Sequence, residues 1–331
     1  MTRMGPVLSR RAALGAAAAS LMARGARAAT AADTLRVGKA VAENFGYVPL
    51  NVGMDRGFFQ QHGLEIEELG FTGGAKIAQA MTARSIDISL SAGPDMQFVA
   101  KGAPEIAVAS ITTSPAFMGY CVGTQSTARG LDDLKGKKIG ITSPGSLTYW
   151  LVDELNRVKG WTGARDRAVQ IVVGGSTAAS LAAIKTAQVD ASLSAAQTGF
   201  LLEYQKAGRL LADCSQYVGA IELFTIFAST ALTKQNPDAV RRFLAAWYEA
   251  VGFMKSHKAE TVAIASKVMG YPPVVAGRSY DTFMSKFSTD GRMNPKAITT
   301  LQASFSDLKV LDGPVDMTKL YTEQFLPKAG G

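Results

Sequence analysis

The chain has 331 residues, of which 47% are hydrophobic and 19% charged, so it can bury substantial cores and its composition excludes a disordered protein. Its formal net charge of +8 belongs mostly to the first 28 residues, which hold five of the 35 basic residues and no acid, so 30 basic residues face 27 acidic ones beyond them. No basic run exceeds Lys135, Lys137 and Lys138, which excludes a nucleic-acid-binding face.

The amino-terminal segment, residues 1–28, has the features of an export signal that is removed from the mature protein. Its alanine-rich run over 12–23 is too short and too weakly apolar to span a bilayer. The sequence SRR at 9–11, followed by AAL, resembles the twin-arginine pattern and indicates export after folding. We expect cleavage near Ala28, with 29–31 as a second candidate, and no lipid anchor because the segment lacks cysteine.

Short apolar, β-rich runs alternate with helical patterns along the rest of the chain. The predicted strands are 35–40, 64–69, 87–91, 106–111, 119–123, 138–142, 170–173, 190–194 and 210–213. The predicted helices between them include 75–83, 147–158 and 178–186. This alternation predicts βαβ units with mostly parallel sheets, which is an α/β fold class.

An internal repeat relates two parts of the chain. GGAKIAQAMTARSIDISLSA at 73–92 aligns without a gap on STAASLAAIKTAQVDASLSA at 176–195, with seven of twenty positions identical, including Asp87 with Asp190. Upstream, the RVGKA of the first unit falls on KIGIT at 138–142, so the similarity reaches the first strand of each unit. A chance match of alanine-rich helices is the alternative. The repeat predicts two lobes of related topology.

A glycine-bearing loop precedes a helix in each unit, at Gly73 and Gly74 in the first and at 174–176 in the second. Loops at the carboxyl ends of parallel strands face one crevice, where helix amino termini offer unpaired N–H groups. Two such sets of loops predict a cleft that binds a small molecule.

The C-terminal part is predicted to be helical. Asn236 is placed to cap a helix whose first position is Pro237. An apolar stripe follows at Val240, Phe243, Leu244, Trp247 and Val251, and its spacing is typical of a helix packed on a core rather than of a ligand platform. A further helix is predicted around 274–287.

Residues that carry covalent or metal chemistry are scarce. Cys121 and Cys214 are too few for a disulfide scaffold and leave two alternatives, a single bridge or two buried free thiols. The two histidines cannot form a metal site by themselves, and His62, in a QQHG turn, is best interpreted as a solvated loop residue. We therefore expect no metal, no cofactor and no catalytic residue.

Three segments resemble the aliphatic sulfonate, nitrate and taurine solute-binding family, also called the thiamine-precursor-like group. They are VGMDRGFFQQHGLEIEELGFTGG at 52–74, LDDLKGKKIGITSPGS at 131–146 and FTIFASTALTKQNPDAVRRFLAAW at 224–247. The resemblance implies a type II periplasmic-binding-protein fold, in which two α/β lobes joined by two crossing segments enclose a ligand cleft. It assigns 29–113 plus 229–331 to lobe 1 and 114–228 to lobe 2.

The resemblance further implies a monomeric, periplasmic solute-binding component of an ABC importer, which captures a small molecule and delivers it to a permease in the inner membrane. A ligand-sensing partner of a membrane receptor would use the same fold. The group also includes enzymes that build a pyrimidine, but these carry a cysteine-rich motif that is absent here. In the implied topology, the strands that hold Cys121 and Cys214 are neighbours, which makes a bridge credible.

Loops at strand ends supply the predicted ligand-binding residues. These are Asn44, Phe45, Gly46, Tyr47, Thr72, Gly73, Gly74, Ser91 and Gly93 from lobe 1, and Gly145, Ser146, Thr148, Tyr149, Ser176, Gln197 and Thr198 from lobe 2. Ser146 and Ser176 could instead cap their helices, and the aromatic residues could belong to the lobe cores. Lys39 is the only well-placed cation and Glu43 would oppose an anion, so an organic sulfonate, carboxylate or heterocycle is expected rather than nitrate.

Overall fold

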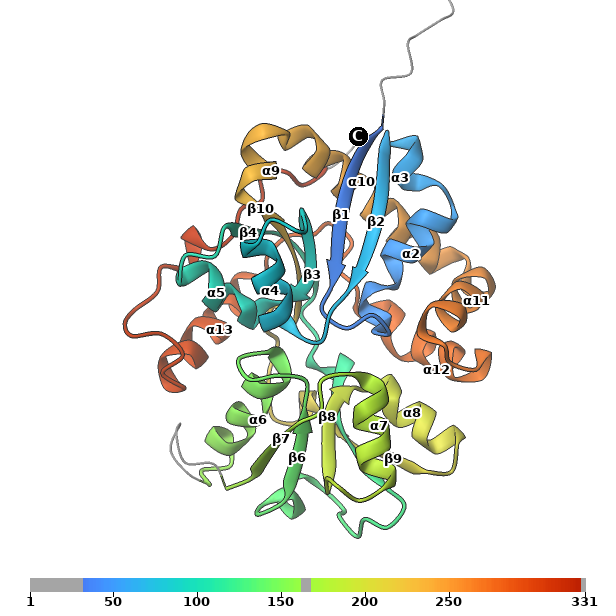
Figure 1. The fold of residues 1–331 in the computed structure, drawn as a ribbon, viewed down its shortest axis with the longest axis vertical. Coiled ribbons are helices and arrows are strands. Elements are labelled where there is room, and N and C mark those ends of the chain that lie inside the picture. The colour runs from blue at the N-terminus through green and yellow to red at the C-terminus, as the bar shows by residue number, and fades with distance from the viewer. Residues whose placement is uncertain (1–31, 162–167, 329–331) are drawn as a thin grey trace, which may run out of the picture. The chain divides into compact units, whose positions relative to one another are not determined.

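The computed structural model describes residues 32–161 and 168–328, so the predicted signal peptide lies outside the described residues. Sheet 1 contains β1 (Asp33–Lys39), β2 (Leu64–Gly70), β3 (Ile88–Ala92), β4 (Glu105–Thr112) and β10 (Phe224–Ser229), in the order β2-β1-β3-β10-β4. Strand β1 is parallel to both β2 and β3, whereas β10 is antiparallel to β3 and β4. We call sheet 1 and the helices on it lobe 1 (Figure 1).

Sheet 2 repeats this arrangement. It contains β5 (Met118–Gly123), β6 (Lys138–Ile141), β7 (Gln170–Val173), β8 (Ala191–Ala195) and β9 (Gly208–Asp213), in the order β7-β6-β8-β5-β9. Both sheets have the same order. Three parallel strands come first, with the earliest strand of the three in the middle, then one antiparallel strand (β10 or β5), and then an edge strand (β4 or β9). Sheet 2 and its helices form lobe 2, and the two related lobes expected from the repeat are confirmed.

The chain passes between the sheets twice. It leaves sheet 1 after Thr112 and enters β5 at Met118, and it leaves β9 at Asp213 and returns to sheet 1 at Phe224. The predicted lobe boundary at residue 228 therefore falls inside β10, which pairs with β3 and β4 of sheet 1. Strand β10 was not among the predicted strands, because its sequence does not show which sheet it joins.

The matched aspartates of the repeat perform the same task in each lobe. Asp87 Oδ2 accepts the backbone N–H of Arg36 at 3.0 Å, and Asp190 Oδ2 accepts that of Lys138 at 2.8 Å. In return, the N–H of each aspartate donates to the carbonyl oxygen of the same partner, at 2.8 and 2.9 Å. Each aspartate thus ties the start of the third strand to the first strand, which explains its place in the repeat.

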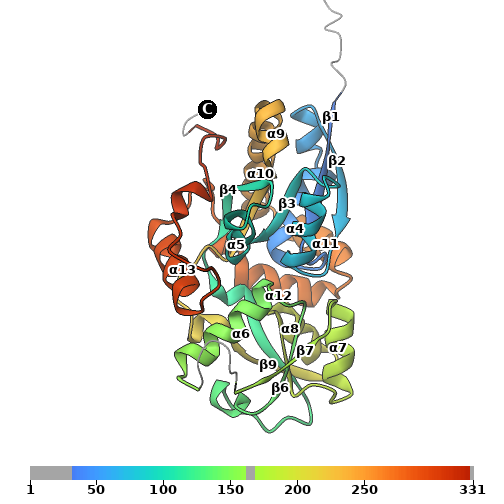
Figure 2. The same ribbon diagram turned by 60° about the vertical axis from the view of Figure 1, so that its left-hand side comes forward.

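Helices cover both sheets (Figures 1 and 2). Lobe 1 carries α2 (Val48–Asp55), α3 (Phe58–Gln61), α4 (Gly74–Thr82), α5 (Met96–Ala100), α9 (Thr230–Gln235), α10 (Pro237–Ser256), α11 (Lys258–Met269), α12 (Pro273–Phe283) and α13 (Pro295–Asp307). Lobe 2 carries α6 (Leu147–Val158), α7 (Thr177–Lys185) and α8 (Gln197–Tyr204). None of the helices in the described part of the chain is long and apolar enough to cross a membrane.

The predicted C-terminal helix is confirmed as α10. Asn236 caps it by accepting the N–H of Ala239 at 3.1 Å, and Pro237 occupies the first turn. The whole predicted apolar stripe, from Val240 to Val251, is buried. The stripe packs into lobe 1 beside α2, so the interpretation of these aromatic residues as core is confirmed.

An aromatic cluster joins the lobes where the chain crosses. Phe117 of the first crossing stacks on Phe283 at the end of α12, with ring centroids 4.5 Å apart, and contacts Phe224 edge-on at 5.7 Å. Phe283 in turn stacks on Phe200 of α8 at 6.0 Å, and Figure 2 shows α12 lying against α8. Phe45 also belongs to this cluster, because its ring lies 6.0 Å from that of Phe283.

The two cysteines are free and buried. Strands β5 and β9 are neighbours, as the resemblance implied, but Cys121 is opposite Leu210, and Cys214 lies in the short helical turn that follows β9. The side chains also belong to different apolar clusters, since Cys121 packs with Ile184 and Cys214 joins the main core. The bridge was therefore a wrong alternative, and the free-thiol alternative holds.

Candidate functional site

A cavity of about 30 Å³ lies between the lobes, at the carboxyl ends of the parallel strands. Lobe 1 and the return crossing contribute Ala40, Val41, Asn44, Tyr47, Gly73, Gly74, Ser91, Ala92, Asp95 and Phe224, and the first crossing and lobe 2 contribute Met118, Thr142, Ser146, Leu147 and Thr148. The loops of the two units therefore converge, as the repeat predicts. A space of this size holds about one water molecule, so the lobes enclose it tightly.

The turn after β1 builds one side of the lobe 1 wall. Asn44 begins a short helix over Phe45–Tyr47 and caps it through Oδ1, which accepts the N–H of Gly46 at 2.8 Å. This turn points the ring of Tyr47 across the wall, where its hydroxyl donates to the carbonyl oxygen of Ser91 at 3.1 Å. Asn44 and Tyr47 are 3% and 2% exposed, so both polar side chains are withdrawn from bulk water.

The turn after β3 places a carboxyl group in the cavity wall. Asp95 is 2% exposed, and its Oδ2 accepts the hydroxyl of Ser91 and, at 3.3 Å, the N–H of Ala92. Its Oδ1 is buried without a hydrogen-bond partner. Burial raises the pKa of Asp95 to about 7, and the bonds from Ser91 and Ala92 oppose that rise.

Two glycines allow the walls to approach this closely. Gly73 has φ +106°, a conformation that favours glycine, and a Cβ there would lie 2.9 Å from Oγ1 of Thr142 in lobe 2. A Cβ on Gly74 would lie 2.1 Å from Oδ2 of Asp95. The predicted glycine loop therefore allows two close contacts. At Gly73 the backbone approaches lobe 2, and at Gly74 it approaches the buried Asp95.

Three hydroxyl groups form the wall on lobe 2, at the start of α6. Thr142 Oγ1 lies 2.8 Å from both Ser146 Oγ and Thr148 Oγ1, and Ser146 Oγ donates to the carbonyl oxygen of Ser143 at 2.7 Å. Ser146 holds the N-cap position but makes no side-chain cap bond, so it faces its hydroxyl neighbours instead. This wall can donate hydrogen bonds, and the amino end of α6 adds a partial positive charge.

Hydrogen bonds tie the two lobes together around the cavity. Gln197 Nε2 donates to the carbonyl oxygen of Glu43 at 3.1 Å, and Thr177 Oγ1 donates to the Glu43 carboxylate at 3.1 Å. Beside them, Gln97 Nε2 donates to the carbonyl oxygen of Gly145 at 3.2 Å. The described structure is therefore a closed arrangement of the lobes.

The sequence profile of the family described as NMT1/THI5 like matches residues 44–261, which is more than half of the chain. The chain belongs to the NMT1/THI5-like family. The match covers β2 to β10 and all of the cavity lining except Ala40 and Val41. It confirms the family that the sequence resemblance indicated.

Relatives of this NMT1/THI5-like chain carry different names. A Haemophilus influenzae protein named for thiamine biosynthesis is 27% identical over 66% of this chain and 68% of its own. A Brucella abortus protein named as a binding protein is 28% identical over 71% of each chain. The solved alkanesulfonate-binding protein SsuA from Xanthomonas axonopodis, bound to MOPS, has a TM-score of 0.74 at 22% identity, covering 88% of this chain and 99% of that one. This likeness confirms the two-lobe fold.

The predicted site residues of this NMT1/THI5-like protein fall into three groups. Asn44, Tyr47, Gly73, Gly74, Ser91, Ser146 and Thr148 line the cavity. Gly145 and Tyr149 line a neighbouring cavity of about 250 Å³ between α5, α6 and the segment after α13. The others, Phe45, Gly46, Thr72, Gly93, Ser176, Gln197 and Thr198, lie outside both linings.

Several residues of that third group have structural contacts. Gly46 packs under Phe224, and a Cβ on Gly93 would meet the carbonyl oxygen of Glu222 at 1.8 Å. Ser176 is exposed and caps α7 by accepting the N–H of Ala179 at 3.2 Å, which was the alternative considered for it. Thr72 is exposed and Thr198 is 1% exposed.

The expectation for Lys39 is wrong. Its side chain is 1% exposed, but Nζ forms an ion pair with Glu68 at 2.5 Å and donates to Asn51 Oδ1 at 3.1 Å. These contacts direct Nζ toward β2 and α2, and Lys39 is not among the residues that line the cavity. Among the residues that line the cavity, Asp95 alone carries a charged group.

Several residues of the lining were not predicted from the sequence, including Asp95, Thr142, Met118 and Phe224. Asp95 follows β3 in the sequence SAGPD, four residues after Ser91, and an acid directly after a strand of this edge was the available signal. Met118 and Phe224 belong to the crossings, so their position depends on how the lobes close.

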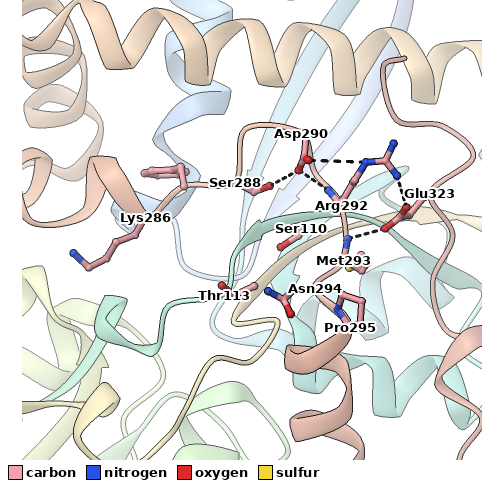
Figure 3. A pocket seen from close by; sticks show the side chains of 11 residues that line it. Ser110, Thr113, Lys286, Ser288, Asp290, Arg292, Met293, Asn294, Pro295 and Glu323 are labelled. Carbon is pink, nitrogen blue, oxygen red and sulfur yellow. Dashed lines mark hydrogen bonds and ion pairs between the residues drawn. The ribbon is translucent and has the colours of Figure 1, made fainter. Parts of the chain in front are cut away.

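A larger cavity of about 590 Å³ lies on lobe 1, beside the first crossing (Figure 3). Arg292 contacts Glu323 at 3.1 Å and Asp290 at 3.9 Å, and Lys286 Nζ donates to the carbonyl oxygen of Thr282 at 2.6 Å. All of its lining residues come from β4, the first crossing and the C-terminal part of lobe 1. We therefore take the smaller interlobe cavity as the candidate site.

Proposed function

We propose that this protein is the extracytoplasmic solute-binding component of an ABC importer, which holds a small organic molecule between its lobes and delivers it to a permease. The observation that carries the proposal is the interlobe cavity itself. Its walls come from two sheets of the same strand order, both present buried polar groups, and hydrogen bonds from Gln197, Thr177 and Gln97 close them together. Membership of the family and a relative named as a binding protein support it.

Binding requires the lobes to move. The present cavity of about 30 Å³ is too small for an organic ligand, so entry needs the lobes to separate about the crossings at 112–118 and 213–224. A ligand that contacts both walls then shifts the population toward the closed state, because such contacts exist only there. Closure presents a defined surface to the permease, and no covalent step is involved.

The described residues offer little for catalysis. Cys121 and Cys214 are buried, and burial raises the pKa of both thiols, that of Cys121 to about 12, which disfavours the reactive thiolate. His62 pairs with Glu249 at 3.1 Å, and His257 stacks on Phe253. No cluster of three or more metal-ligating His, Cys, Asp or Glu residues occurs within 32–161 and 168–328.

The proposal includes the route to the compartment. A twin-arginine-type signal over 1–28, cleaved near Ala28, would export a folded, unlipidated monomer to the periplasm, where it meets its permease in the inner membrane. Fusion of residues 1–35 to a reporter that folds in the cytoplasm, compared with an Arg10→Lys, Arg11→Lys version, tests this route. Export that does not depend on the arginine pair contradicts it.

Ligand screening tests the binding function. We expect isothermal titration calorimetry over amines, amidines, heterocycles, carboxylates and sulfonates to find saturable, one-to-one binding, together with a smaller radius of gyration in solution scattering when ligand is added. The double variant Gly73→Leu, Thr142→Leu, which fills the space between the walls, should lose both effects while it keeps its far-ultraviolet circular dichroism. Absence of saturable binding across the library contradicts the function.

A further inference from the structure

The interlobe cavity has a charged group on one wall only. Asp95 is 2% exposed in lobe 1, and the other residues of the lining are apolar, glycine, or uncharged polar. The nearest candidate cation from the sequence, Lys39, is occupied by Glu68 and Asn51. A buried carboxyl group without a cationic partner is unfavourable, since an isolated charge away from water is costly.

The hydrogen bonds of Asp95 use only one of its two oxygens. Oδ2 accepts from Ser91 and Ala92, which is what the turn requires, and Oδ1 has no partner. Tyr47, on the same wall, donates its hydroxyl to a backbone carbonyl oxygen instead. An asparagine would cap the same turn through one oxygen without introducing a charge, so capping does not account for an acid here.

We propose that Asp95 selects ligands that present a basic, N–H-bearing nitrogen, such as a protonated amine, amidine or guanidine, and that Oδ1 accepts the N–H of that group. The inference rests on the proposed binding function and specifies the ligand class. A cationic nitrogen supplies both the missing donor and the missing charge, and charge-assisted hydrogen bonds are about twice as strong as neutral ones. The hydroxyl groups of Thr142, Ser146 and Thr148 remain for an acceptor elsewhere on the ligand.

The groups in and around the cavity include acids but no cation in the lining, which favours a cationic ligand over an anionic one. Glu105 of β4 is 3% exposed, and burial, together with the nearby Asp95 carboxyl group, raises the pKa of Glu105 to about 8. Tyr47, from the turn after β1, is buried and also coupled to Asp95, which raises its pKa further. The facing wall of lobe 2 has hydroxyl groups and no charge. An anionic head group would therefore meet a carboxyl group without a compensating cation.

The variants Asp95→Asn and Ser91→Ala separate the charge from the turn. Asp95→Asn keeps an oxygen that can accept from Ser91 and Ala92, and Ser91→Ala removes one of those bonds but keeps the carboxylate. The probes are a panel of alkylamines, amidines and guanidines, matched in size with carboxylates, sulfonates and nitrate. Calorimetry is performed between pH 5.5 and 8.5, and thermal unfolding verifies that each variant folds.

We expect the wild-type protein to bind members of the basic set and to weaken by at least tenfold in Asp95→Asn, with a smaller loss in Ser91→Ala. Guanidines keep their charge over this pH range, so wild-type affinity for them should fall by up to about tenfold per pH unit as Asp95 is protonated below pH 7. In Asp95→Asn this pH dependence should vanish, which a purely structural role of the acid would not produce.

Saturable binding of acids alone, or basic ligands bound equally well and with the same pH profile by Asp95→Asn, overturns the inference and leaves the binding function intact. If no compound of either set binds the folded wild-type protein, the proposed function fails, and the inference that depends on it fails as well. The two failures are distinguished by whether any ligand produces a heat signal that saturates.

Discussion

Gln197 of lobe 2 donates its side-chain amide to the backbone carbonyl oxygen of Glu43 in lobe 1, at 3.1 Å. Gln197 is fully buried, and its Oε1 has no partner, so the side chain is held by this one bond across the cleft. The carboxylate of Glu43 accepts a second hydrogen bond from lobe 2, which Thr177 donates. The loop after β1 is thus both a wall of the candidate site and the point at which lobe 2 attaches.

Removing this bond should shift the protein toward the open arrangement. A hydrogen bond of this kind contributes about 1 kcal/mol, so we expect Gln197→Ala to weaken ligand affinity by roughly three- to tenfold and to increase the radius of gyration without ligand. Gln125→Ala is the matched control, because Gln125 donates the same type of bond to Ile184 within lobe 2. Equal effects of the two variants on affinity would contradict the role of the Gln197 bond.

Gly74 should tolerate no side chain. A Cβ there would lie 2.1 Å from Asp95 Oδ2, so Gly74→Ala should displace the acid and abolish ligand binding in calorimetry. Gly252, exposed on α10, has open space around its missing Cβ. Gly252→Ala should instead stabilise the fold by about 0.5–1 kcal/mol, the usual gain in a helix interior, and leave binding unchanged. Normal ligand affinity of Gly74→Ala would show that Asp95 does not depend on this contact.

The equivalent aspartates should contribute unequally to stability. Asp190→Ala leaves the N–H of Lys138 without its acceptor, which should lower the free energy of unfolding by about 1 kcal/mol. Asp87→Ala should lower it by about 2 kcal/mol, since Asp87 also accepts two bonds from the Arg36 guanidinium, at 2.8 and 2.9 Å. Urea unfolding measures both. Asp132→Ala, which breaks only an exposed ion pair with Lys159, should change little, and a loss there as large as that of Asp87→Ala would refute the argument.

Glu222 should make stability depend on pH. Glu222 is fully buried in the return crossing. The Ser110 hydroxyl donates to its Oε2 at 2.5 Å, and the N–H of Asn294 donates to its Oε1 at 2.6 Å. Burial raises the pKa of Glu222 from 4.5 to about 7. The folded state therefore retains a proton that the unfolded state releases, so the free energy of unfolding falls as pH rises from 4.5 toward 7. The limiting slope is about 1.4 kcal/mol per pH unit for one group.

The variant Glu222→Gln removes this titration. We expect urea unfolding at pH 5, 6, 7 and 8 to give a flatter profile than wild type and a higher stability at pH 8. Glu65→Gln, at an exposed position of β2, is the control and should leave the profile unchanged. An unchanged slope in Glu222→Gln would assign the pH dependence to other buried acids, such as Glu105, whose pKa is raised to about 8.

The sequence predicts the lobes better than their junction. Strand periods and the aspartate repeat are local, so β7 and α6 begin and end where expected, and the order of both sheets follows from one unit. Strand β10 was missed because its pairing partners, β3 and β4, lie more than a hundred residues away in the chain. The disulfide alternative for the two cysteines was wrong for the same reason, because the register between β5 and β9 is a long-range property that the sequence does not show.

The candidate site was predictable as loops but not as individual contacts. Gly73 and Ser146 were identified from their positions at strand ends, and both line the cavity. Asp95 was overlooked because GPD is also an ordinary turn sequence, which does not show that the side chain is buried. Lys39 is the opposite case. Its place at the end of β1 suggested that it would reach the ligand, but its side chain pairs with Glu68 and Asn51 instead.

The position of β10 between β3 and β4 fixes the order in which the molecule can be completed. All strands of sheet 2 precede residue 214, so lobe 2 can finish folding while the ribosome is still synthesising the remainder. Sheet 1, by contrast, lacks the strand between β3 and β4 until residue 229 has emerged, although its other strands are made first. A premature stop in that interval would leave the edges of β3 and β4 without their shared partner strand.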